Sequence, residues 1–269
     1  PAPRETERAI LHTKPKAAQP GGALRDIPRS AVIARYVRML KAAGAGEETA
    51  LRFAAGKNEA FALECAAALE AAQAGAETYS LSADGTKLSA SAGNGREISY
   101  WQILTAYCAL SGKKQISLPN DTPRFAETLL RAHGITPLFY GDGKSEARTL
   151  AAEEPFVRDG TLLAFATEAE LRRCGTTLSA ATGGMAGFTV LTRAVYAEKE
   201  RMPGVITALR GEFGGGRCVG FDIGEGHISI FPSAAGALRV IAEAYDSETA
   251  EEISLRAAEM LEKRFWKQE

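Results

Sequence analysis

Apolar side chains recur along the chain at two different spacings, which separate the predicted helices from the predicted strands. Repeats of three and four residues predict six helices, at residues 30–43, 59–74, 99–110, 122–133, 159–173 and 247–265. Short or alternating apolar runs predict strands at residues 50–55, 79–81, 88–92, 115–118, 137–140, 219–223, 228–231 and 238–244. Helices and strands alternate at first and strands predominate later, so the pattern predicts an α/β region followed by an α+β region.

The order of these elements also predicts how the chain divides. A strand, a helix and a strand lie between Gln115 and Tyr140, which is typical of a βαβ unit with parallel strands in a helix-covered sheet. Five prolines and few large apolar residues mark the first 28 residues as a linker or extended arm. We therefore expect a linker over residues 1–29, two small α/β/α domains over residues 30–99 and 100–184, and an α+β domain with an antiparallel sheet over residues 185–269.

Composition and charge argue against nucleic acid and membranes as partners of this chain. The 269 residues are 45% hydrophobic and 24% charged, which is typical of a globular chain, and the formal net charge is -1. This balance gives no basic surface for nucleic acid, and no apolar run approaches the ~18 residues of a membrane span, so we expect neither as a partner. The polar N-terminus lacks the apolar stretch of a signal peptide, and we expect a cytoplasmic protein.

Cysteine and histidine give no sign of a metal site. The cysteines occur singly among apolar neighbours, which predicts reduced thiols in the core: Cys65, Cys108, Cys174 and Cys218. The histidines have no helical partner for a metal ion and are predicted on the surface: His12, His133 and His227. No motif of a hydrolase is present, so the residues alone indicate no catalytic site.

One turn has the residue types of an anion site. Residues 231–236, Phe-Pro-Ser-Ala-Ala-Gly, join two predicted strands through small side chains that let a ligand approach the backbone. Successive amide groups and the hydroxyl of Ser233 can together hold a phosphate. The same residue types suit a plain hairpin connection, and both interpretations stay open.

The residues around this turn resemble the last domain of the α-D-phosphohexomutases, the family of phosphoglucomutase and phosphomannomutase. In that family an Arg-Pro-Ser-Gly-Thr-Glu-Pro phosphate loop precedes a strand with arginine, valine and glutamate, and residues 226–244 are similar to it. Residues 82–87, Ser-Ala-Asp-Gly-Thr-Lys, resemble the family's metal loop, Asp-Gly-Asp-x-Asp-Arg, and residues 115–141 resemble its third domain. The resemblance runs from residue 30 to 265 in the family's domain order two, three, four, and implies two small phosphohexomutase-like α/β/α domains before the α+β domain.

The resemblance implies a phosphate site but no catalytic residue. It assigns Ser233 and Arg239 to phosphate binding, whereas Phe231 replaces the arginine of the family's phosphate loop. The family's first domain carries the phosphoserine that exchanges phosphate with the hexose, and no Thr-Ala-Ser-His-Asn-Pro segment occurs in this chain. Phosphoryl transfer depends on positioning and charge neutralisation, so we expect no mutase turnover from this chain by itself.

The resemblance also implies a reduced Mg²⁺ site. Asp84 stands at one of three family aspartates that hold the ion, while Ser82 and Thr86 replace the other two. A single carboxylate is a poor site for Mg²⁺, so Asp84 is at most a weak metal ligand. Lys87 keeps the positive charge of the family's arginine but not its bidentate fork.

Three functions follow as expectations. The one we favour is a noncatalytic module that binds or senses a hexose phosphate, attached to a sugar nucleotidyltransferase domain. The second is a fragment of an active phosphomutase, an intramolecular phosphotransferase whose first domain supplies the serine. The third is a scaffold for oligomerisation. Because 269 residues are too few for a complete phosphohexomutase and the chain starts with proline, we expect its partner to be an N-terminal domain of the same longer chain.

Overall fold

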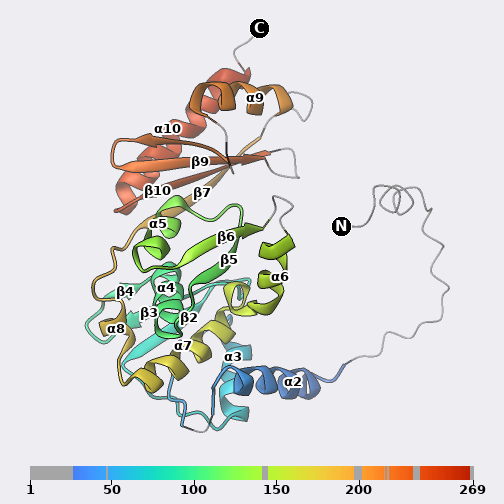
Figure 1. The fold of residues 1–269 in the computed structure, drawn as a ribbon, viewed down its shortest axis with the longest axis vertical. Coiled ribbons are helices and arrows are strands. Elements are labelled where there is room, and N and C mark those ends of the chain that lie inside the picture. Colours follow the sequence, from blue (N-terminus) through green and yellow to red (C-terminus); the bar gives the residue numbers. More distant parts are fainter. Residues whose placement is uncertain are drawn as a thin grey trace, which may run out of the picture.

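The computed structural model describes residues 27–46, 48–140, 145–196, 202–214, 216, 218–232 and 237–266. Figure 1 shows a larger body, formed by the chain as far as helix α8 (Leu178–Ala181), and a C-terminal unit that stands on one end of it. Buried apolar side chains form two separate clusters, one in each part. The division of the larger body into two domains stays a prediction.

The first sheet of the larger body has the strand order β1-β2-β3-β4. Its strands are β1 (Arg52–Phe53), β2 (Glu77–Leu81), β3 (Leu88–Ala92) and β4 (Glu97–Ile98). β1 runs parallel to β2, and the other neighbouring strands are antiparallel. Every second residue of β2 and β3 is buried, because alternate side chains of a strand point to opposite faces and one face meets the core. The turn between β2 and β3 places Gly85 at a φ of 69°, which favours glycine.

The larger body also contains a second, two-stranded sheet. β5 (Gln115–Pro119) and β6 (Thr136–Tyr140) pair in parallel and are connected through α5 (Arg124–Ala132), as the βαβ prediction requires. α4 (Tyr100–Leu110) begins at a capping box in which Ser99 and Gln102 bond reciprocally. The remaining elements of the larger body are α2 (Arg29–Ala42), α3 (Ala60–Ala68), α6 (Ser145–Glu153), the 3₁₀ turn η1 (Pro155–Arg158) and α7 (Gly160–Cys174). α7 packs against α2, α4, β2 and β3 and thereby covers the first sheet.

The C-terminal unit is an antiparallel sheet covered by two helices (Figure 1). The strand order is β7-β10-β9-β8, with β7 (Thr189–Tyr196), β8 (Val219–Ile223), β9 (Gly226–Pro232) and β10 (Ala237–Ala244). α9 (Met202–Phe213) packs on β8, and α10 (Ser247–Trp266) packs on β7, β9 and β10. The predicted fold class, α/β followed by α+β with an antiparallel sheet, is confirmed. Among the helices described, none combines the length and the hydropathy of a membrane span.

Some predicted element bounds are wrong. α3 ends at Ala68 and not near residue 74, because Glu70 has a φ of 56° and the chain then turns away. The backbone of Ala72 instead bonds to residues on both sides of Ala50, with N–O distances of 3.0 Å to Thr49 and 3.1 Å to Leu51. β7 and α9 were not predicted; in β7 the burial does not alternate cleanly along the strand, so its sequence carries little of the strand period.

Two predictions about cysteine and histidine are also wrong. Cys65 and Cys108 lie in the core, where burial raises the pKa of each thiol to about 12, but Cys174 is exposed. His133 is exposed as predicted, whereas His227 is buried, with 4% of its surface accessible. His12 lies outside the described residues.

Candidate functional site

A cavity of about 370 Å³ lies where the larger body meets the C-terminal sheet, and we call it the basic cavity. Three cationic side chains line it, Lys87, Arg158 and Arg239, together with the carboxylate of Asp121. Its volume falls in the range of small-molecule sites, roughly 300 to 1,000 Å³. The rest of the wall is largely aromatic and apolar, and includes Tyr100, Trp101, Tyr140, Val157 and Ile241.

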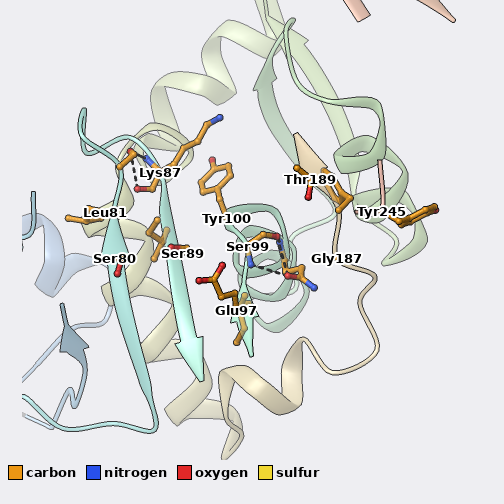
Figure 2. A pocket seen from close by; sticks show the side chains of 15 residues that line it. Ser80, Leu81, Lys87, Ser89, Glu97, Ser99, Tyr100, Gly187, Thr189 and Tyr245 are labelled. Atoms are coloured by element: carbon orange, nitrogen blue, oxygen red, sulfur yellow. Dashed lines mark hydrogen bonds between the residues drawn. The ribbon is translucent and has the colours of Figure 1, made fainter. Parts of the chain in front are cut away.

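Lys87 is held at the cavity by the turn between β2 and β3. Its backbone N–H donates to Ser82 Oγ at 2.9 Å, and its carbonyl accepts from the backbone N–H of Ser82 at 2.9 Å. The Lys87 Nζ lies 5.9 Å from the ring centroid of Tyr100 and 5.8 Å from that of Trp101. Figure 2 shows the Lys87 side chain extending from the turn on the side of the Tyr100 ring. The two aromatic rings thus position the ammonium group at the cavity wall.

Arg158 also belongs to the larger body and lines the same cavity. It is the last residue of η1, and the next residue, Asp159, caps α7 by accepting from the backbone N–H of Leu162 at 3.0 Å. The Arg158 guanidinium carbon lies 5.4 Å from the ring centroid of Tyr140, and its Nη2 donates to the carbonyl of Ala151 at 3.3 Å. The remaining N–H groups of this planar fork are available to an anion, since no ion pair of Arg158 occurs among the described residues.

Arg239 is supplied by the C-terminal sheet. It lies in β10 between Ala194 of β7 and Phe231 of β9, and its guanidinium carbon is 5.7 Å from the Phe231 ring centroid. Arg239 Nη2 is 2.6 Å from Asp121 Oδ2 in the loop before α5. This ion pair joins the two parts of the molecule at the cavity wall.

A buried carboxylate fixes the C-terminal sheet against α5 close to this ion pair. Glu243 of β10 is fully buried and accepts from the backbone N–H groups of Arg124 at 2.8 Å and Phe125 at 2.6 Å. α5 has no side-chain cap from its own neighbours, so Glu243 serves as its cap across the interface. The Arg124 side chain also bonds to Asp222 Oδ1 at 3.0 Å, and His227 Nδ1 lies 2.7 Å from the same oxygen. The hydrogen bond to His227, reinforced by Arg124, lowers the pKa of the Asp222 carboxyl.

A second cavity of about 560 Å³ adjoins the first, and both are lined by Lys87 and Tyr100. We call it the hydroxyl cavity, because four serines and a threonine contribute to its wall: Ser80, Ser82, Ser89, Ser99 and Thr189. Figure 2 shows that most of them lie on β2, β3 and the start of α4, with Thr189 on the facing segment. Apart from Lys87, Glu97 is the charged residue of this wall among the described residues. Such a surface suits the hydroxyl groups of a sugar.

The turn that resembles a metal loop is closed by its own hydrogen bonds. Asp84 Oδ1 accepts from Ser82 Oγ at 2.7 Å, from Thr86 Oγ1 at 2.9 Å and from the Thr86 backbone N–H at 3.1 Å. The Ser82 hydroxyl and then Thr86 hold the pKa of the Asp84 carboxyl at about 2. No group of three histidine, cysteine, aspartate or glutamate residues that would hold a metal ion occurs among the described residues. This donor set does not fit Mg²⁺, which prefers several carboxylate, phosphate or water oxygens.

We predict that Mg²⁺ has little effect on stability. At about 5 mM MgCl₂ the melting temperature should rise by less than about 2 °C, because a site with a dissociation constant of about 10 mM or weaker adds only about 0.2 kcal/mol. Differential scanning fluorimetry measures this. The double variant Ser82→Asp, Thr86→Asp places three carboxylates in the turn and should gain a Mg²⁺-dependent rise; an equal rise in the unmodified protein would contradict the prediction.

The structure brings together only part of what the sequence indicated. Arg239 lies in the basic cavity, Asp84 lines neither cavity, and Ser233 lies outside the described residues. Asp121 and Arg158 were not identified as site residues. The sequence feature that could have identified Arg158 is its position just before the helix predicted at residues 159–173. No feature of the neighbouring sequence distinguishes Asp121 from a solvated turn residue.

The described wall of the basic cavity combines cationic hydrogen-bond donors with one paired carboxylate. No histidine, cysteine or glutamate is found among the described residues of its wall, so its threonine hydroxyls have no such base beside them. Its one described carboxylate, Asp121, is paired with Arg239. Two arginine forks and an ammonium group are donors that phosphate binds well.

The larger α/β body followed by an antiparallel α+β unit is a phosphohexomutase-like fold. A phosphoglucomutase/phosphomannomutase family protein from Burkholderia thailandensis superposes with a TM-score of 0.58 at 15% sequence identity, covering 88% of this chain and 65% of that one. A protein assigned as a phosphomannomutase from Thermus thermophilus gives a TM-score of 0.51 at 13% identity, covering 86% and 66%. The chain therefore spans just under two thirds of the length of these structures.

These similarities establish the fold alone, because the identities are low. No family model and no curated protein matches the sequence. An N-acetylphosphoglucosamine mutase from Aspergillus fumigatus, solved in complex with GlcNAc-6P and magnesium, covers 71% of this chain and 53% of its own at 13% identity. Its TM-score of 0.41 is too low to support an argument about ligands.

Proposed function

We propose that this chain is a noncatalytic module that binds a sugar phosphate between its larger body and its C-terminal sheet. The observation that carries the proposal is the convergence of Lys87, Arg158 and Arg239 on one cavity. The phosphoryl group occupies the basic cavity, where the two guanidinium forks donate hydrogen bonds to its oxygens and Lys87 adds a point charge. The sugar hydroxyls face the serines of the adjoining hydroxyl cavity. The phosphohexomutase-like fold supports this choice of ligand class.

The absence of turnover is part of the proposal. The described wall of the basic cavity offers no histidine or glutamate base, the turn at Asp84 does not fit Mg²⁺, and the sequence lacks the family's serine segment. Without these groups a bound phosphate is positioned but its transfer is not assisted. We propose that binding reports sugar-phosphate levels to a nucleotidyltransferase domain of the same longer chain.

A second candidate is a fragment of an active phosphomutase. The coverage favours it, because the chain spans just under two thirds of the matched structures, and a missing domain can supply the serine. An assay for conversion of glucose 1-phosphate to glucose 6-phosphate by this chain separates the two in part: turnover of about 1 s⁻¹ or more, the low end for enzymes, excludes the noncatalytic proposal. Absence of turnover leaves the source of the serine to be decided by sequencing upstream for Ser-His-Asn-Pro.

Replacing Arg158 with glutamine should weaken glucose 6-phosphate binding about tenfold or more. The change removes a charged donor from the cavity and leaves a shorter, neutral polar side chain, and hydrogen bonds to charged groups are the stronger ones. Isothermal titration calorimetry with glucose 6-phosphate and mannose 6-phosphate measures the dissociation constants. The matched control is Arg52→Gln, which removes an exposed arginine of β1 that lines neither cavity. Equal affinities in the two variants, or no heat from the unmodified protein, would overturn the proposed function.

A further inference from the structure

The charges that line the two cavities are unequally distributed. The described wall of the basic cavity has a net charge of +2, from the cations Lys87, Arg158 and Arg239 and the carboxylate of Asp121. The hydroxyl cavity shares Lys87 with it and adds one charged residue among those described, Glu97. One end of the combined site is therefore cationic, and the other end carries a carboxylate.

The negative charge of Asp121 is a fixed part of the basic cavity. Asp121 lies between Asn120 and Thr122, and Thr122 closes a turn through its backbone N–H and its hydroxyl, both of which donate to the Pro119 carbonyl, at 3.0 and 2.7 Å. The following residues begin α5, which Glu243 caps from the C-terminal sheet. The side chain of Asp121 is only 31% exposed and stays against Arg239.

Glu97 places a second carboxylate in the combined site, at the wall of the hydroxyl cavity. It lies in β4, the edge strand of the first sheet, where only β3 pairs with it. Figure 2 shows its carboxylate directed into the space between β3 and the Tyr100 ring. No hydrogen bond or ion pair of the Glu97 side chain occurs among the described residues, so its charge is not neutralised there.

We propose that the site selects ligands with a single phosphomonoester group and rejects sugar bisphosphates, with Asp121 and Glu97 as the specificity-determining residues. This inference rests on the proposed function. A phosphomonoester carries close to two negative charges near neutral pH, which the net charge of the basic cavity balances. A second phosphoryl group on the other end of the sugar lies toward Glu97, where like charges repel and no further described cation compensates. Without Asp121 the described wall of the basic cavity would carry one more net positive charge, which would favour a second phosphate.

The test compares glucose 6-phosphate with glucose 1,6-bisphosphate by calorimetry at about pH 8, where both phosphate groups are fully ionised. The unmodified protein should bind the monophosphate at least about tenfold more tightly, as expected for one unfavourable charge pair at short range. Glu97→Gln should reduce this preference at least about fivefold by tightening the bisphosphate, and Asp121→Asn should act in the same direction. Glu225→Gln removes an exposed carboxylate outside both cavities and should leave the preference unchanged.

The outcomes separate this inference from the proposed function. If the unmodified protein binds the bisphosphate as tightly as the monophosphate, or if Glu97→Gln leaves the ratio unchanged, the selectivity is overturned while sugar-phosphate binding stands. If neither ligand binds, the proposed function fails and the inference fails with it. Asp121→Asn also removes an ion pair of the interface, and this variant could unfold for that reason. Glu97 has no side-chain hydrogen bond or ion pair with another described residue, so Glu97→Gln then decides the result.

Discussion

Replacing Glu243 with alanine should lower the free energy of unfolding by about 3 kcal/mol. Glu243 is fully buried, and its two oxygens accept from the backbone N–H groups of Arg124 and Phe125. Alanine leaves both donors at the start of α5 without this acceptor at a partly buried position, and each such loss costs about 1 to 3 kcal/mol. Urea denaturation followed by circular dichroism measures the change.

Glu243→Ala should destabilise the protein more than the loss of an ordinary helix cap, because Glu243 caps α5 from another part of the molecule. Glu243 also ties the C-terminal sheet to the larger body, so its loss should loosen the basic cavity and weaken glucose 6-phosphate binding. Glu259→Ala is the matched control, because Glu259 lies on the exposed face of α10, 65% exposed and 3.7 Å from Lys263. Exposed pairs of this kind contribute about 0.5 kcal/mol or less. A loss of stability in the Glu243 variant no larger than in the control would refute the cap.

The protein should lose about 2 to 3 kcal/mol of stability between pH 5 and pH 8 through Glu168 alone. Burial, with a further contribution from the charge of Glu77, raises the pKa of Glu168 to about 7, although a hydrogen bond from the Tyr79 hydroxyl at 2.7 Å opposes the shift. The unfolded chain has the ordinary pKa near 4.5, so the folded state holds the proton more tightly. The stabilisation is therefore fully present below pH 4.5 and is lost as the pH rises through 7.

The variant Glu168→Gln isolates this effect from the other titrating groups. Glutamine keeps an oxygen that accepts the hydrogen bond from Tyr79 and carries no charge at any pH. The free energy of unfolding of the variant should therefore change by about 2 kcal/mol less than that of the unmodified protein over the same pH range. Unfolding in urea at pH 5, 6, 7 and 8 gives both curves. Glu170→Gln, on the same helix and paired at the surface with Arg173, should retain the unmodified slope. Parallel curves for Glu168→Gln and the unmodified protein would show that Glu168 does not titrate in this way.

Local patterns predicted much of the secondary structure because they depend on neighbouring residues. The helix predicted at residues 99–110 begins at the capping box of Ser99, and the helix predicted at residues 247–265 begins where Asp246 caps it, so both starts involve residues within a few positions of one another. The same argument explains the failures. α3 stops early because Ala72 pairs with residues 49–51, and β7 forms because β10 provides a partner along its whole length. Neither partner is visible in the local sequence.

The sequence by itself determined the fold class, most helices and strands, and Arg239 as a candidate phosphate ligand. Only the tertiary structure decided that Arg158 and Asp121 share its cavity, and that Glu243, on the polar side of its strand by pattern, is buried as a cap for α5. The physical reason is the range of the interactions. Helix and strand periods act between residues one to four positions apart, whereas the basic cavity joins residues 87, 121, 158 and 239, which only the packing of the two parts brings together.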